Sequence, residues 1–241
     1  MPTQLHLSPD PTAVAADFTR FFFEAMEGKE HFSVALSGGS TPKLLFQLWA
    51  QEYSTAVDWS KVRFFWGDER CVPPNHEESN YGMTKSLFFN HIDIPEKNIH
   101  RVIGEAEPGA EAIRYSAEIS DNTEEQLDGY PVFDLVILGM GGDGHTASIF
   151  PHQMELLHAE EFCGVATHPE SGQKRVSITG NVINRANTVA FLVTGASKLE
   201  KVTSILERKE DAAQYPAAHV QPVSGDLHWF LDEAAYGKEA Q

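Results

Sequence analysis

Two apolar segments of the sequence run directly into glycine-rich loops, and this repeated junction constrains the fold more than any other feature. Residues 34–36 lead into a first loop at 37–41, and residues 136–138 lead into a second loop at 139–144. An apolar run that ends in glycine is typical of a buried strand followed by a tight turn. Ligands of open α/β sheets bind outside the carboxyl ends of the strands. The two loops therefore predict one shared crevice.

Predicted strands and helices alternate along the whole chain. Apolar patterns predict strands at 4–7, 32–36, 62–66, 133–138, 175–179 and 188–193. Helical spacing predicts helices at 11–27 (ended by Gly28), 42–51, 79–89, 109–126 and 197–208. This alternation predicts an α/β fold, with an open, mostly parallel, twisted, Rossmann-like sheet and helices on both faces. At 241 residues we expect a single domain spanning 1–241.

The charge balance excludes one class of partner. The chain has 35 acidic and 18 basic residues, a formal net charge of −17 at pH 7, whereas nucleic-acid binding needs clustered Lys and Arg. We therefore expect no nucleic-acid partner, although a small anion needs only a few local cations. No apolar stretch approaches 18 residues, so no membrane partner is expected. With no secretory pattern and only Cys71 and Cys163, a cytoplasmic location is expected.

The first loop has the composition of a phosphate-binding turn. It contains Ser37, Gly38, Gly39, Ser40 and Thr41. Thr41 is predicted to be the N-cap of the next helix, with Pro42 at its first position. Backbone N–H groups and hydroxyls at a helix N-terminus bind phosphate well. An ordinary strand-to-helix turn is the alternative, but the small polar residue in every non-glycine position favours phosphate.

The second loop matches the pattern G-x-G-x-x-G at Gly139, Gly141 and Gly144, which raises the alternative of dinucleotide binding. That reading needs a long helix after the third glycine, and Pro151 interrupts it. Asp143 and His145 would also lie where the pyrophosphate passes. Acid–base chemistry by these two side chains is the favoured interpretation.

Charged residues follow another predicted strand. Asp68, Glu69 and Arg70 come soon after 62–66, where a site role is slightly favoured over a solvated loop. Arg175 and Lys198 are surface cations when each is taken alone.

No nucleophile-elbow motif exists, and Cys71 has no nucleophile signature. The spacing of His145, His152 and His158 is too irregular for a metal site, so none is expected.

Taken together, these blocks resemble the 6-phosphogluconolactonase subfamily of the glucosamine/galactosamine-6-phosphate isomerase family. The resemblance runs in order through Ser37-Gly38-Gly39-Ser40-Thr41-Pro42, Asp68-Glu69-Arg70-Cys71-Val72-Pro73 with Ser79-Asn80, Gly139-Met140-Gly141 with Asp143-Gly144-His145-Thr146-Ala147-Ser148, Arg175-Val176-Ser177-Ile178-Thr179, Lys198 and Trp229-Phe230-Leu231-Asp232. Gly142 departs from the pattern, where a bulkier residue is expected.

The resemblance implies hydrolysis of 6-phospho-D-glucono-1,5-lactone to 6-phospho-D-gluconate in the oxidative pentose phosphate pathway. His145 would take a proton from the attacking water, and Asp143 or Asp68 would orient this histidine or hold substrate hydroxyls. Arg70 would face either the phosphate or the oxyanion. The phosphate would be held by the first loop (Ser37 to Thr41), Gly141, Arg175 and Lys198. No cofactor is expected because a lactone is already an activated ester; the partner is the sugar-phosphate lactone, and the chain a monomer or small homo-oligomer.

Two relatives of that family are the alternatives. Glucosamine-6-phosphate deaminase shares the implied fold, but it is expected to carry Tyr in place of Arg70 and a catalytic Glu soon after the histidine. Here no Glu follows His145 until Glu155. A non-enzymatic sugar-phosphate sensor is the second alternative, but sensors of this fold carry a DNA-binding module for which this acidic chain is too short.

Overall fold

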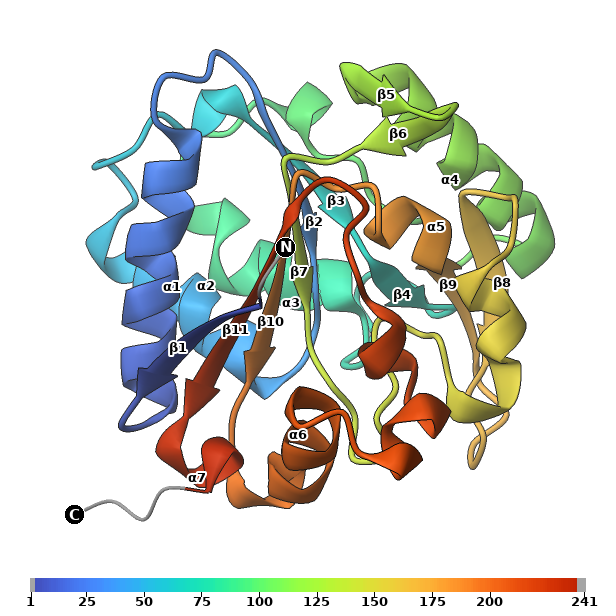
Figure 1. Ribbon diagram of the computed structural model, residues 1–241. Coiled ribbons are helices and arrows are strands. Elements are labelled where there is room, and N and C mark those ends of the chain that lie inside the picture. The colour runs from blue at the N-terminus through green and yellow to red at the C-terminus, as the bar shows by residue number, and fades with distance from the viewer. Residues whose placement is uncertain (1–2, 238–241) are drawn as a thin grey trace.

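The computed structural model describes residues 3–237, and its centre is a six-stranded sheet (Figure 1). In sheet order the strands are β1 (Gln4–Ser8), β11 (Asp226–Asp232), β10 (Thr188–Val193), β7 (Leu135–Leu138), β2 (Phe32–Leu36) and β3 (Val62–Trp66). All five neighbouring pairs are parallel. Within residues 3–237, no helix has the length and apolar character needed to cross a bilayer.

Helices cover both faces of this sheet, which confirms the predicted α/β class. In Figure 1, α1 (Pro11–Met26) and α2 (Ser40–Glu52) lie to the left of the sheet, and α4 (Pro108–Asn122) and α5 (Gly180–Ile183) to the right. Successive residues of a strand point to opposite faces. Accordingly Phe64 packs against Trp59, whereas Phe65 stacks on His100. Both faces are therefore apolar, as parallel strands require.

Three strands form a second, antiparallel sheet beside the first. Its order is β4 (Asp68–Arg70), β9 (Lys174–Ile178) and β8 (Cys163–Thr167). The predicted strand at 175–179 therefore exists, but it is not part of the parallel sheet. The reason is that the chain leaves β3 through Gly67, whose N–H and C=O bond to Leu36 and Ile178, and continues as a new edge for β9.

Shorter elements connect these strands and helices, in addition to several 3-10 turns of three to five residues. They are α3 (Asn80–Leu87), the hairpin β5 (Glu125–Leu127) and β6 (Tyr130–Val132), a 3-10 helix at Pro151–Leu157, α6 (Leu199–Leu206) and α7 (Glu233–Tyr236). The helix expected at 109–126 stops at Asn122, because residues 125–127 pair with β6 instead. Gly28, expected to end the first helix, follows it with φ +76°, a left-handed conformation that favours glycine.

Candidate active site

A cleft of about 220 Å³ lies at the carboxyl ends of β2 and β7. These two strands are hydrogen-bonded neighbours, yet the chain continues from β2 to β3 on one side and from β7 to β10 on the other. Such a reversal opens a crevice between the loops that follow the two strands. The first and second loops meet there, as the sequence predicts.

The cleft collects most of the residues that the sequence nominates. Its lining includes Ser37, Gly38, Gly39, Ser40, Thr41, Asp68, Arg70, Gly141, His145, Arg175 and Lys198. Asp143 is the nominated residue outside this lining, and it contacts His145 instead. The cleft lining also includes residues that the sequence analysis did not nominate as catalytic or ligand-binding: Pro42, Asn80, Met140, Ala147, Leu192, Val193 and Thr194.

Of these cleft residues, Thr194 could have been nominated from a strand-to-glycine pattern in the sequence, whereas Asn80 could not. Thr194 follows the apolar strand β10 and precedes Gly195, which is a third strand-to-glycine junction of the kind that marks the two loops. Asn80 follows no such junction, and the motif match that includes it gave it no role. Its side chain fills the space beside Gly38, where a Cβ would lie 1.9 Å from Asn80 Oδ1, and its Nδ2 donates to the Asp68 carbonyl at 2.9 Å. Asn80 thus links the first loop to β4.

The first loop enters α2 earlier than predicted. The helix starts at Ser40 with Gly39 as its N-cap, so the prediction of Thr41 as N-cap and Pro42 as first residue is wrong. Gly39 adopts φ +107°, which lets the chain turn into the helix two residues sooner. Thr41 instead shares a hydrogen bond with Thr194 (Oγ1 to Oγ1, 2.9 Å). Among the described residues no side chain caps this helix, which leaves its first-turn N–H groups facing the cleft.

The second loop holds an imidazole–carboxylate pair. His145 Nδ1 lies 2.6 Å from Asp143 Oδ1, and the His145 backbone N–H donates to the same oxygen. With Nδ1–H directed at the carboxylate, Nε2 is left as the basic nitrogen. Partial burial raises the pKa of Asp143, but the hydrogen bond and charge of His145 outweigh it and lower that pKa to about 2. Asp143 therefore stays ionised at neutral pH.

The glycines of this loop make the pair fit. Gly141 donates its N–H to the His145 carbonyl at 2.9 Å, and a Cβ at Gly141 would lie 2.1 Å from His145 Nδ1. Gly144 has φ +81°. No α-helix starts directly after Gly144, because the next helical element is the 3-10 helix that begins at Pro151. The helix N-terminus that dinucleotide binding needs is thus absent from this part of the described chain.

A second charged group comes from the antiparallel sheet. Arg70 and Arg175 are cross-strand partners on β4 and β9, so both guanidinium groups reach the same rim. The buried Asp68 accepts a hydrogen bond from Ser148 Oγ at 2.6 Å and lies 3.9 Å from Arg175 Nη1. The Nε atoms of Arg70 and Arg175 are buried without a hydrogen-bond partner in the described structure. These donors suit an anionic ligand.

Lys198 brings a third cation to the cleft. It ends the 3-10 helix at Ala196–Lys198, directly after β10. Burial lowers the pKa of Lys198, and the charge of Asp143 opposes this shift. The cleft therefore concentrates three cations in a protein of net charge −17, beside an imidazole base. Nowhere in residues 3–237 do three or more His, Cys, Asp or Glu side chains group as metal ligands.

Comparisons with known proteins match most of the chain. A family model described as glucosamine-6-phosphate isomerases/6-phosphogluconolactonase matches residues 11–229. A 6-phosphogluconolactonase of Haemophilus influenzae is 46% identical over 84% of this chain and 85% of its own, and that of Treponema pallidum is 45% identical over 83% of both. The solved structure of a devB protein superposes with a TM-score of 0.93 at 41% identity, covering 99% of this chain and 100% of that one. A monomeric glucosamine-6-phosphate deaminase shares the fold, with a TM-score of 0.81 at 19% identity over 98% of this chain and 100% of its own.

Proposed function

We propose that this chain, which belongs to the family of glucosamine-6-phosphate isomerases and 6-phosphogluconolactonases, uses His145 to activate the water molecule that attacks the substrate. The two relatives named above are 6-phosphogluconolactonases, and this chain matches them over most of their length. The reaction is therefore hydrolysis of 6-phospho-D-glucono-1,5-lactone to 6-phospho-D-gluconate, in the oxidative pentose phosphate pathway. The observation that carries the mechanism is the His145–Asp143 pair beside a cationic cleft.

The proposed steps use only the side chains of this cleft. His145 Nε2 takes a proton from water as the water oxygen attacks the lactone carbonyl carbon. The carbonyl oxygen then carries negative charge, which the guanidinium groups of Arg70 and Arg175 stabilise. When the intermediate collapses, the bond between this carbon and the ring oxygen breaks. The imidazolium returns its proton to the departing ring oxygen, which gives a hydroxyl and a carboxylic acid that ionises.

Asp143, rather than Asp68, orients the histidine in this mechanism. Asp143 Oδ1 contacts His145 Nδ1, whereas Asp68 is engaged by Ser148 and lies near Arg175. An ionised carboxylate at Nδ1 fixes the ring orientation and stabilises the imidazolium that forms during attack. Asp68 in turn orients Arg175 and is placed to hold substrate hydroxyls.

The phosphate of the substrate is assigned to the first loop and Lys198. The loop offers first-turn N–H groups of α2 together with the hydroxyls of Ser40 and Thr41. Thr41 also bonds to Thr194, which precedes the turn that carries Lys198. A phosphate between them would receive backbone donors, hydroxyls and a full positive charge.

A turnover assay on two substrates tests this function. We expect proton release from fresh phosphogluconolactone well above the spontaneous rate, and no ammonia from glucosamine 6-phosphate. Glu155, the first glutamate after His145, lies on the 3-10 helix and not in the cleft lining, so the deaminase chemistry lacks its carboxylate there. Ammonia release with only spontaneous lactone loss would replace this function by that of a deaminase.

The role of His145 has its own test. His145→Ala should lower kcat by about 10²–10⁴, the usual contribution of a positioned general base, with little change in KM. Added imidazole should restore part of the lost rate. A variant with nearly unchanged kcat would remove His145 from the mechanism while leaving the lactonase activity itself intact.

A further inference from the structure

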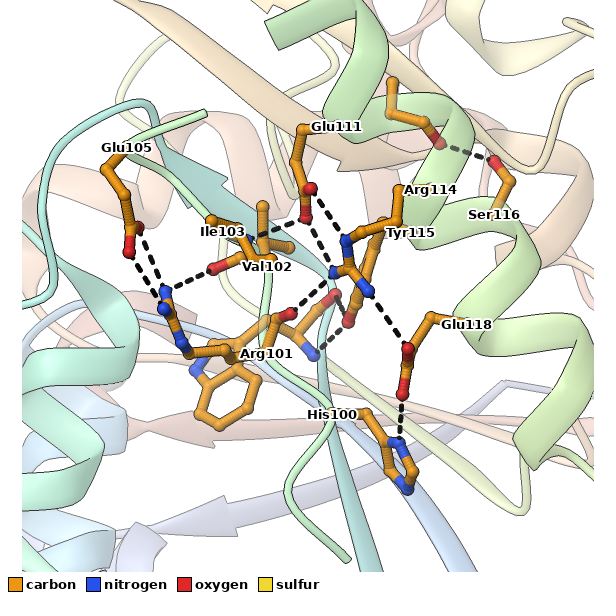
Figure 2. A network of polar contacts seen from close by, with 12 residues as sticks. His100, Arg101, Val102, Ile103, Glu105, Glu111, Arg114, Tyr115, Ser116 and Glu118 are labelled. Carbon is orange, nitrogen blue, oxygen red and sulfur yellow. Dashed lines mark hydrogen bonds and ion pairs between the residues drawn. The ribbon is translucent and has the colours of Figure 1, made fainter. Parts of the chain in front are cut away.

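A network of charged side chains joins α4 to the loop before it (Figure 2). Arg114 stands at its centre: its Nε and Nη2 donate to the two oxygens of Glu111, each at 2.8 Å. Its Nη1 donates to Glu118 Oε2 at 3.0 Å, and the other oxygen of Glu118 contacts His100 Nδ1 at 2.7 Å. None of these side chains lines the catalytic cleft.

This network fixes the backbone of the loop at residues 101–103. Arg114 Nη2 donates to the Arg101 carbonyl at 3.0 Å, and Glu111 Oε1 accepts the backbone N–H of Ile103 at 2.7 Å. The Glu111 carboxylate is only 2% exposed. Arg114 is 36% exposed, so Glu111 is the buried member of the pair, and a buried carboxylate that loses its partner is destabilising. Glu111 and Arg114 therefore hold the loop through these backbone hydrogen bonds.

The loop presses a glycine against the segment that carries Arg70. A Cβ at Gly104 would lie 2.5 Å from the Arg70 carbonyl oxygen and 2.6 Å from that of Val72, closer than real Cβ atoms approach. The Val72 N–H donates to the same Arg70 carbonyl at 2.8 Å. Gly104 does not have a positive φ, so close approach alone accounts for the need for glycine.

The network also reaches the other flank of this segment. The guanidinium of Arg101, paired with Glu105, lies 5.3 Å from the centre of the Tyr81 ring. The Tyr81 N–H donates to the buried carboxylate of Glu69 at 2.8 Å, and that carboxylate also accepts the Arg70 N–H at 2.8 Å. The backbone of Arg70, from which its guanidinium extends to the cleft, is thus held from both sides by contacts that lead back to α4.

We propose that Gly104, held in place by Glu111 and Arg114, positions the Arg70 guanidinium for lactone hydrolysis. These three are positioning residues, because they touch Arg70 or its support and not the cleft. The inference rests on the proposed function, in which Arg70 acts on the substrate.

A double-mutant cycle between Gly104→Ala and Arg70→Ala tests this coupling. A Cβ at 104 must retreat by about 0.5–0.9 Å to reach the 3.0–3.4 Å range of tight but real contacts. A misplacement of about 1 Å can cost about 10²-fold, so we expect Gly104→Ala to lower kcat/KM by about 10-fold or more. The loss should divide between kcat and KM as it does in Arg70→Ala. In the Arg70→Ala background the same change should alter kcat/KM by less than about 2-fold.

Two further variants keep the test decisive. Gly109→Ala on α4 is the matched control, since the three atoms nearest to its Cβ all belong to the Glu107 side chain, at 3.3 Å or more, and we expect unchanged kinetics. If Gly104→Ala does not fold, Glu111→Gln, which keeps an acceptor for the Ile103 N–H, replaces it in the same cycle with a smaller loss of the same character.

The outcomes separate this inference from the function on which it rests. Wild-type hydrolysis together with a defect in Arg70→Ala supports the proposed function. If the loss in the folded Gly104 or Glu111 variant is then fully additive with Arg70→Ala, or absent, the positioning role is refuted and the lactonase function stands. A wild-type protein without lactonase activity refutes the function first.

Discussion

Replacing Gly141 with alanine would displace His145, the proposed general base, without removing any functional group. The new Cβ would lie 2.1 Å from His145 Nδ1, 2.3 Å from its Cε1 and 2.7 Å from Asp143 Oδ1. All three atoms belong to the imidazole–carboxylate pair, so the methyl group cannot be accommodated unless that pair moves. Gly141 does not have a positive φ, and alanine therefore adds no backbone strain of that kind.

The expected loss follows from the required displacement. Ordinary van der Waals contact begins at 3.4 Å, so the ring must move about 1.3 Å away from the new methyl group. Misplacing a reacting group by about 1 Å costs about 10²-fold, and the whole general-base contribution is about 10²–10⁴-fold. We expect Gly141→Ala to lower kcat by at least about 10²-fold, and by no more than His145→Ala.

The assay is proton release from fresh lactone at constant pH, corrected for spontaneous hydrolysis, with thermal unfolding to verify the fold. Gly142→Ala is the control in the same loop, because a Cβ there meets nothing within 4 Å. We expect it to retain the wild-type kcat. A folded Gly141→Ala with wild-type kcat, or an equal loss in Gly142→Ala, would show that the position of the His145 ring does not limit the reaction.

Two other predictions concern the phosphate and the core. Lys198→Ala should lower kcat/KM by about 10- to 100-fold, since a charge-assisted hydrogen bond contributes about 1.5–3 kcal/mol. Inorganic phosphate should also inhibit this variant less than the wild type. Equal turnover of gluconolactone with and without its phosphate group would contradict the assignment of the phosphate to this site. Tyr115→Phe should lower the free energy of unfolding by about 1–3 kcal/mol in urea titrations, because the buried Tyr115 hydroxyl donates to the Trp66 carbonyl at 3.0 Å and accepts the Trp66 N–H at 2.8 Å. An unchanged midpoint would mean that other groups satisfy these backbone atoms.

Sequence patterns predicted the central sheet well where the strands are buried on both faces. β2, with every residue buried, and β10 match their predicted bounds, because a fully apolar run has few alternatives. The short strands β4 and β5 were not predicted, since their residues are charged or polar and their pairing depends on partners far along the chain. β9 was found but assigned to the wrong sheet, because strand direction is set by tertiary pairing that local composition does not encode.

The site was predictable as far as strand ends could be located. Parallel strands bring their carboxyl ends to one edge, so the meeting of the two loops followed from the fold class alone. The 2.6 Å contact between Asp143 and His145 did not follow from the sequence, because sequence spacing left Asp68 equally available as the partner of His145. Asn80 went unassigned for a related reason: its contact with Gly38 depends on how α3 packs, which no local pattern reports.

The proposed phosphate site at the uncapped start of α2 would make the stability of the fold depend on which ligand occupies the cleft. An anion that accepts hydrogen bonds from the first-turn N–H groups of α2 would take the place of the missing capping side chain. By thermodynamic linkage, a ligand that binds only the native state raises the unfolding free energy with the logarithm of its concentration. The increase in melting temperature can then rank stable phosphate esters by affinity without any turnover. This is useful because the lactone substrate hydrolyses spontaneously in solution. The thermal stability of the protein would thus report whether a ligand is bound at the first turn of α2.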